Sequence, residues 1–190
     1  MAASRFKRNR ICLLMAILWM AVIFMFSNRP ADESARDSSF VGEIILHVTV
    51  PDFEELSPAV QEEMLESITY PVRKCAHMTE YAVLAALWLG TLYLAHTASA
   101  NADGSTKNDG LPLFIRKACS PHVAAASRNA FLISVLYACT DEFHQIFVPG
   151  RSGEPTDILI DAGGAVIGLL LTVILRAAYL KIHSPEKADL

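Results

Sequence analysis

Three short segments of this chain carry the side chains that could take part in chemistry. In the first, RKCAHMTEY, the residues Arg73, His77 and Glu80 are spaced +4 and +3, so they stack on one face of a helix. The second segment, 137–151, and the third, 156–168, add carboxylates, a histidine, a glutamine and an arginine. The candidate site residues are Arg73, Lys74, His77, Glu80, Tyr81, Asp141, Glu142, His144, Gln145, Arg151, Asp157 and Asp161.

These residue types suit two kinds of chemistry. A histidine and a carboxylate at one site are the usual pair of general acid–base catalysis, with Glu80 or His77 as the base and His144 as the acid. An arginine fork suits a phosphate group, so Arg73 and Arg151 are candidate phosphate clamps. The candidate catalytic residues are His77, Glu80, Asp141, Glu142 and His144, and the candidate ligand-binding residues are Arg73, Lys74, Tyr81, Gln145, Arg151, Asp157 and Asp161.

Other interpretations of the same residues stay open. The basic side chains could pair with the carboxylates and lock a helix bundle, since charged groups inside a membrane commonly pair with one another. Two histidines and several carboxylates are an adequate metal ligand set, but HxxE and ExH on separate helices form no recognised metal motif, so no metal site is assigned. Proton-coupled transport needs a polar path across the membrane, which the sequence does not indicate. The sequence identifies no cofactor.

The elements that carry these residues are predicted to be membrane helices. Hydrophobic residues make up 53% of the 190 residues and charged residues 19%, below the roughly 25% of soluble domains, and the mean hydropathy is +0.34. We therefore expect an all-α fold, a polytopic bundle of about four transmembrane helices in one domain over 1–190. Gly164 and Gly168 form a small-xxx-small pair, which predicts a close contact between two helices. The predicted spans are approximately 11–27, 78–98, 124–144 and 158–178.

The segments between the predicted spans differ in kind. Within the outer segment 28–76, apolar residues recur at helical spacing over 40–48 and again over 60–68. This spacing predicts two short amphipathic helices that lie on the outer interface or cap the bundle, with Pro51 and Pro58 between them. Residues 99–123 begin with a stretch rich in turn formers and are expected to form a flexible cytoplasmic loop.

The lysine and arginine distribution predicts the orientation, because cytoplasmic loops carry an excess of these residues. Eleven of the sixteen lie in the N-terminal segment, the 99–128 loop and the C-terminal segment. Both termini are therefore expected in the cytoplasm, and all three polar segments at the outer face of a cell membrane. Sixteen of the twenty acidic residues lie on that outer side. The net charge of −4 does not suggest a nucleic-acid partner.

The cysteines offer little chemistry. Cys12, Cys75, Cys119 and Cys139 form no CxxC pair, which argues against a metal–thiolate site. Cys75 and Cys139 are both expected near the outer surface, where a disulfide could form, although two separate thiols are the favoured interpretation.

Three stretches of the sequence resemble the VanZ family of bacterial membrane proteins. They are FSNRPADES after the first predicted span, RKCAHMTEYAVLAAL at the second, and YACTDEFHQIFVPGRSGEPTDILIDAGGAVIG across the third and fourth. The first stretch departs from the family pattern. The segment after the first helix usually resembles FSSQ in the family, whereas this chain reads FSNR. The resemblance implies a multi-pass cell-membrane protein, and the name-giving member is associated with resistance to the glycopeptide antibiotic teicoplanin. The motif positions carried over are Arg73, Lys74, His77, Glu80, Tyr81, Asp141, Glu142, His144, Gln145, Pro149, Gly150, Arg151, Asp157, Asp161 and Gly164, and their roles are our own hypotheses.

Residues and resemblance together predict a small cell-envelope protein with a polar pocket at its outer face. We expect this pocket to bind a cell-wall precursor or another anionic lipid head group, and either to modify it or to sequester it. The contrasting hypothesis is a non-catalytic structural or accessory protein whose polar rim only stabilises the bundle. Membrane lipids are the expected partners, while catalysis, a link to glycopeptide resistance and the oligomeric state stay open.

Overall fold

The computed structural model describes residues 2–99 and 119–183, and within these ranges the protein is all-helical, with no strand. The predicted all-α fold is therefore confirmed. The helices are α1 (Ala2–Ser27), α2 (Ala31–Thr49), the short 3₁₀ helix η1 (Phe53–Glu55), α3 (Pro58–Ser99), α5 (Pro121–Gln145) and α6 (Pro155–His183). Residues 100–118, most of the expected cytoplasmic loop, lie outside the described residues, and the end of that expected loop already belongs to α5.

Four of the described helices are long and apolar enough to cross a membrane. Each predicted span lies within one of them, so the chain is a multi-pass membrane protein. The four segments that meet these criteria are Arg8–Ser27, Pro58–Ala95, Pro121–Gln145 and Pro155–His183.

The helix α3 is longer than the sequence analysis predicted. The second of the two expected outer helices, around 60–68, does not end before the span but continues into it as one helix of 42 residues. Pro71 lies inside this helix. A proline removes one intrahelical hydrogen bond, and here the helical hydrogen bonds on both sides of it persist. At 1.5 Å per residue, α3 is about 60 Å long, roughly twice the thickness of the hydrocarbon core, so much of it must project beyond the membrane.

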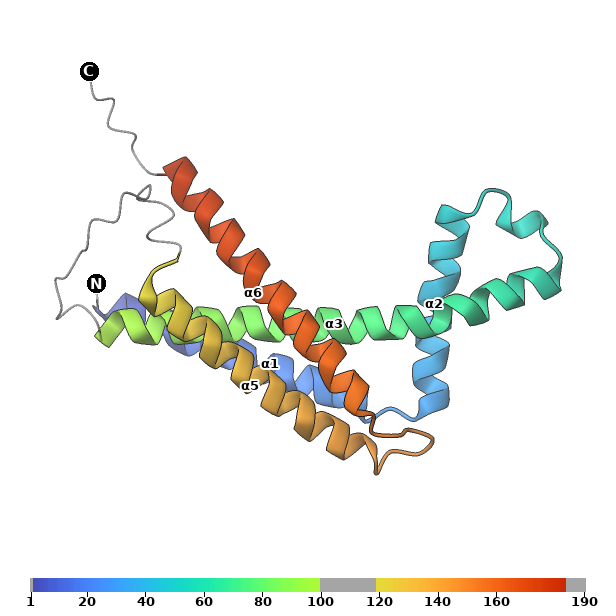
Figure 1. Ribbon diagram of the computed structural model, residues 1–190, viewed down its shortest axis with the longest axis horizontal. Helices are drawn as coiled ribbons and strands as arrows, with labels where there is room; N and C mark the ends of the chain where they lie inside the picture. The colour runs from blue at the N-terminus through green and yellow to red at the C-terminus, as the bar shows by residue number, and fades with distance from the viewer. Residues whose placement is uncertain (1, 100–118, 184–190) are drawn as a thin grey trace, which may run out of the picture.

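The projecting half of α3 packs against α2, at one end of the bundle (Figure 1). The expected helix over 40–48 is present within α2, where Gly42 and Leu46 are buried. A Cβ added to Gly42 would lie 3.0 Å from Cγ2 of Ile68 on α3. The two helices are therefore in close contact along this face, while Phe40 and Val48 of α2 stay exposed.

The helix α3 is the centre of the bundle, since α1, α2, α5 and α6 all pack against it. In Figure 1, α6 crosses α3 obliquely. A Cβ added to Gly164 would overlap the carbonyl oxygen of Met78, and one added to Gly168 would overlap that of Ala82. The predicted close contact at this glycine pair is therefore present, and the partner helix is α3.

The chain segments that carry the three polar clusters meet at one end of the bundle. There the end of α1, the end of α5, the start of α6 and the middle of α3 come together with α2 (Figure 1). The loop 146–154 turns at Gly150, where φ is +73°, and the Ala31 amide donates a 3.2 Å hydrogen bond to the Pro149 carbonyl oxygen. This bond ties the α5–α6 loop to the start of α2.

Candidate functional site

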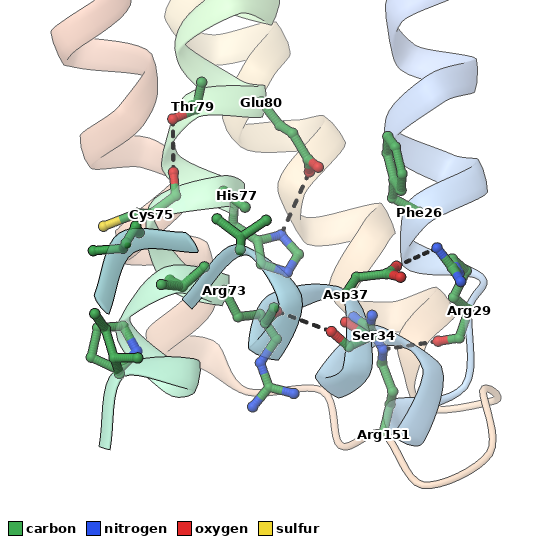
Figure 2. A pocket seen from close by; sticks show the side chains of 17 residues that line it. Phe26, Arg29, Ser34, Asp37, Arg73, Cys75, His77, Thr79, Glu80 and Arg151 are labelled. Atoms are coloured by element: carbon green, nitrogen blue, oxygen red, sulfur yellow. Dashed lines mark hydrogen bonds and ion pairs between the residues drawn. The ribbon is translucent and has the colours of Figure 1, made fainter. Parts of the chain in front are cut away.

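A cavity of about 590 Å³ opens between the end of α1, the helix α2 and the middle of α3 (Figure 2). Charged and polar groups line one part of it, and aliphatic side chains of α2 and α3 line the rest. The cavity is therefore amphipathic, as a site for a lipid head group would be. Its lining residues are Phe26, Arg29, Ser34, Asp37, Ser38, Val41, Ile45, Ile68, Pro71, Val72, Arg73, Cys75, Ala76, His77, Thr79, Glu80 and Arg151.

Three arginines line this cavity, and their surroundings differ. Arg29 forms ion pairs with Glu33, at 3.4 Å, and with Asp37. The Arg73 guanidinium lies 5.8 Å from the centre of the Tyr70 ring and forms no ion pair with a carboxylate of the described residues. Arg73 therefore brings a positive charge to the cavity that no neighbouring acid neutralises.

Arg151 is held in place by two hydrogen bonds. Its Nε donates to the carbonyl oxygen of Arg29 and its Nη1 to Oε1 of Gln145, both at 3.1 Å. Neither acceptor carries a charge. Burial lowers the pKa of Arg151 from its usual range and the positive charge of Arg73 lowers it further, while the carboxylates of Asp141, Glu142 and Glu80 act in the opposite direction. Two guanidinium groups thus act on each other at one cavity, an arrangement that an anion would stabilise.

His77 and Glu80 line the cavity from α3, on the same face of this helix as Arg73 (Figure 2). Nδ1 of His77 lies 3.8 Å from Oε2 of Glu80, which is within ion-pair range but too long for a hydrogen bond. Their side chains are only 13% and 17% exposed, and Oε2 of Glu80 has no hydrogen-bond partner among the described residues. The pair can accept or donate a proton, or bind a hydroxyl group that enters the cavity.

A second, smaller hollow of about 130 Å³ shares Arg73, His77 and Arg151 with the first. Lys74 and Asp157, which also line this hollow, form an ion pair with side chains 13% and 14% exposed. These two residues therefore fit the interpretation that basic and acidic side chains pair with one another and lock the helix bundle. The three shared side chains lie between a small polar hollow and a large amphipathic one.

Three carboxylates of α5 and α6 lie inside the bundle and line neither hollow, namely Asp141, Glu142 and Asp161. Oδ2 of Asp141 accepts hydrogen bonds from Ser27, at 2.8 Å, and from Gln145, at 3.1 Å. Oε2 of Glu142 accepts the amide hydrogen of Glu154 at 2.8 Å, which anchors the loop just before α6. Both side chains therefore bind other parts of the protein.

Tyr81 and Asp161 are also interior residues. Tyr81 is fully buried and Asp161 is 1% exposed. Neither the Tyr81 hydroxyl nor either Asp161 carboxylate oxygen has a hydrogen-bond partner within the part of the chain that the structure describes. The structure does not bring these two residues to the cavity with Arg73 and His77.

His144, the expected acid, is turned away from the cavity. Its Nε2 lies 3.2 Å from Oδ1 of Asn28, and its ring centre is 4.7 Å from that of Phe24. His144 lines neither hollow. The structure therefore provides no pairing of His144 with Glu80 or His77. The physical reason is that the end of α1 lies against the end of α5, where Phe24 and Asn28 contact the His144 side chain.

Three cavity residues from α2 and the segment just before it were not among the predicted site residues. Arg29, Ser34 and Asp37 all line the larger cavity. Arg29 and Ser34 belong to the FSNRPADES stretch, and Asp37 lies three residues after it. The available signal was the position of this stretch, after the first span and on the same side as the other polar clusters. The Trp19 indole also donates a 2.9 Å hydrogen bond to the Glu80 carbonyl oxygen, which fixes α1 against the site helix.

Metal and disulfide chemistry find little support in the described residues. Over 2–99 and 119–183, no three or more His, Cys, Asp or Glu side chains are placed to hold a metal ion. Cys75 and Cys139 are both free and exposed. The disulfide left open by the sequence is therefore not formed in this structure.

Comparison with known proteins gives one match. The model of the family described as VanZ/LLP1 matches residues 12–176, which is most of the chain. No curated protein and no solved structure matches it. The matched region contains both hollows and all four candidate membrane spans in whole or in part.

Proposed function

Because this chain belongs to the VanZ/LLP1 family of membrane proteins, we propose that it is a cell-membrane protein that binds the anionic head group of a lipid. The observation that carries the proposal is the amphipathic cavity, which Arg73 and Arg151 both line and where no carboxylate of the described residues forms an ion pair with Arg73. A phosphate group between the two guanidinium groups would remove their mutual repulsion and accept charge-assisted hydrogen bonds from both.

The ligand class is a lipid phosphate. A phosphate fits the arginines, and a hydroxyl or sugar on the head group fits His77 and Glu80, whose Oε2 is buried without a hydrogen-bond partner. The aliphatic side chains of Val41, Ile45 and Ile68 in the same cavity suit the apolar part of the molecule. A lipid-linked cell-wall precursor and a phospholipid are two sources of this chemistry. A link to glycopeptide resistance would follow only from the first source.

The site belongs to the outer face in this proposal. The excess of lysine and arginine at the opposite end of the spans and in the flanking segments supports cytoplasmic termini. The cavity at the α2 end of the bundle would then face the outer leaflet.

A second candidate function is that of a structural protein whose polar groups serve the bundle alone. The Lys74–Asp157 ion pair and the hydrogen bonds of Asp141 and Glu142 favour this role for those four residues. A purely structural role does not account for Arg73, because no carboxylate of the described residues forms an ion pair with it.

Native mass spectrometry of the detergent-purified protein tests the proposal. The lipids added are polyprenyl phosphate, phosphatidic acid and, as a zwitterionic reference, phosphatidylcholine. We expect the two phosphates to be retained in preference to phosphatidylcholine, and the preferred one identifies the source. Arg73→Gln should weaken phosphate-lipid binding about tenfold or more, since hydrogen bonds to charged groups contribute about 1.5–3 kcal/mol.

The matched control is Arg36→Gln. Arg36 pairs with Asp32 on the exposed side of α2 and does not line the cavity, so this variant should bind as the wild type does. Equal retention of all three lipids by the wild type, or equal binding by both variants, would reject the head-group site and leave the structural role.

A further inference from the structure

A second groove lies between α3 and α6 and shares two lining residues with the amphipathic cavity. This groove has a volume of about 480 Å³, and its walls are almost entirely aliphatic. No residue with a charged side chain lines it. Its lining residues are Cys75, Met78, Thr79, Ala82, Val83, Ala86, Ile167, Gly168, Leu171, Thr172 and Leu175.

Cys75 and Thr79 line both the cavity and this groove. From these two residues the groove follows α3 through Ala82 and Ala86, at spacings of +4, +3 and +4, which form one stripe on the helix. The stripe covers about 16 Å along the helix axis. It leads from the level of Arg73 and His77 toward the Ser99 end of α3, so a chain bound in it would extend away from the cavity.

The packing of α3 against α6 explains why the groove exists. The two backbones touch where Gly168 meets Ala82, and the helices diverge from this crossing (Figure 1). The α3 side of the groove carries small side chains at Cys75, Thr79, Ala82 and Ala86, which leave the space between the helices unfilled. Both helices are candidate membrane spans, so the material next to this space is hydrocarbon.

We infer that the groove holds a hydrocarbon chain of the same lipid whose phosphate lies at Arg73 and Arg151. The inference rests on the proposed function, and it adds that the protein recognises a two-part ligand, with the head in the cavity and a chain along α3. The lining residues Cys75 and Thr79, which the groove shares with the cavity, support this occupant over a helix of another protein, which would not need the cavity. Moving a chain from the bilayer into the groove removes no water, so the groove mainly orients the lipid through van der Waals packing.

Photo-crosslinking tests this placement. The probe is phosphatidic acid that carries a diazirine midway along one acyl chain, bound to the purified full-length protein and photolysed. Peptide mapping by mass spectrometry then locates the adducts. We expect them to concentrate on residues 75–86 of α3 and 167–175 of α6.

Two variants of α6 provide the matched comparison. Leu171 lines the groove, whereas its neighbour Leu170 does not, and both are more than half exposed, at 53% and 57%. Leu171→Trp should fill the groove and reduce these adducts at least fivefold, whereas Leu170→Trp should leave them unchanged. Retention of the same lipid in native mass spectra should change less than threefold in both variants, because the head-group contacts remain.

The outcomes separate the two proposals. Lipid retention with adducts spread evenly over all spans, or equal adducts in the two variants, would overturn the chain-binding groove and leave the head-group site standing. Loss of these adducts in a protein that native mass spectra show as a dimer would indicate a second copy as the occupant and would likewise overturn the inference. Failure of the wild type to retain phosphatidic acid and polyprenyl phosphate would reject the proposed function, and the groove inference with it.

Discussion

The Arg151 guanidinium donates a 3.1 Å hydrogen bond to the carbonyl oxygen of Arg29, although 122 residues separate the two in the chain. Arg151 also donates to Gln145, Gln145 donates to Asp141, and Ser27 donates to the same carboxylate oxygen. These bonds form a network from α1 through α5 to the α5–α6 loop. The network holds Arg151 at the cavity through the buried side chains of Asp141 and Gln145.

Gln145→Leu tests this positioning role. The variant removes the acceptor of Arg151 and one donor to Asp141, so we expect about 1–3 kcal/mol lower stability and several-fold weaker lipid-phosphate binding. The control is Gln61→Leu, which removes hydrogen bonds to the Phe53 and Leu56 carbonyl oxygens and should lower thermal stability without weakening binding. Equal losses of binding in the two variants would contradict the positioning role.

Arg151 and Arg29, which are joined by this hydrogen bond, should contribute differently to lipid binding. Arg151→Gln removes a cavity cation and should weaken binding of phosphatidic acid about tenfold. Arg29→Gln keeps the backbone carbonyl that Arg151 uses and loses only the partly exposed ion pairs with Glu33 and Asp37, which contribute little. Its binding should stay within threefold of the wild type in the same mass-spectrometric titration. A larger loss for Arg29→Gln than for Arg151→Gln would contradict this assignment.

The glycines at the start of α6 allow a sharp stability comparison. Gly164→Ala places a Cβ on the Met78 carbonyl and should destabilise the protein by about 1–3 kcal/mol through overpacking. At the adjacent Gly163 nothing lies within 4 Å of an added Cβ, so Gly163→Ala should be neutral or stabilising by about 0.5–1 kcal/mol. Thermal unfolding in detergent measures both, and equal melting temperatures would mean that α3 and α6 do not touch here.

The Lys74–Asp157 ion pair is expected to stabilise the bundle. Lys74→Met leaves the largely buried Asp157 carboxylate without its partner and should cost several kcal/mol. The double variant Lys74→Met with Asp157→Leu removes both charges and should recover most of this loss in a thermal unfolding assay. A double variant no more stable than Lys74→Met would show that the two side chains act independently.

The proposed orientation can be tested with single cysteines in a variant whose four native cysteines are replaced by serine. Glu154→Cys in the α5–α6 loop should react with a membrane-impermeant maleimide on intact cells. Lys181→Cys, at the exposed far end of α6, should react only after the cells are opened. The reverse pattern would place the cavity on the cytoplasmic side.

Helix content, the number of spans and the shared face of Arg73, His77 and Glu80 could all be predicted from the sequence. These features depend on local chain properties, namely apolar run length and the 3.6-residue period of the helix. The glycine pair of α6 was predictable for the same reason, since a small-xxx-small pattern indicates a close helix contact without naming the partner.

The extent of α3 was not predictable in the same way. The apolar spacing over 60–68 predicted a short outer helix apart from the span over 78–98, yet one helix runs from Pro58 to Ser99. Packing of α2 against its projecting half supplies contacts that local propensity does not include.

Only the tertiary structure decided which polar residues share a site. From the sequence, His144, Asp141 and Asp161 were as good candidates for the site as Arg151, because all four are predicted at the same end of the bundle. Helix packing turned Asp141 and Asp161 into the interior and His144 toward Asn28, and it brought Arg29 and Asp37 into the cavity. The sequence by itself determined a membrane protein with polar groups at one end, whereas the rotation of each helix about its axis, set by contacts with distant segments, decided which of them face the cavity.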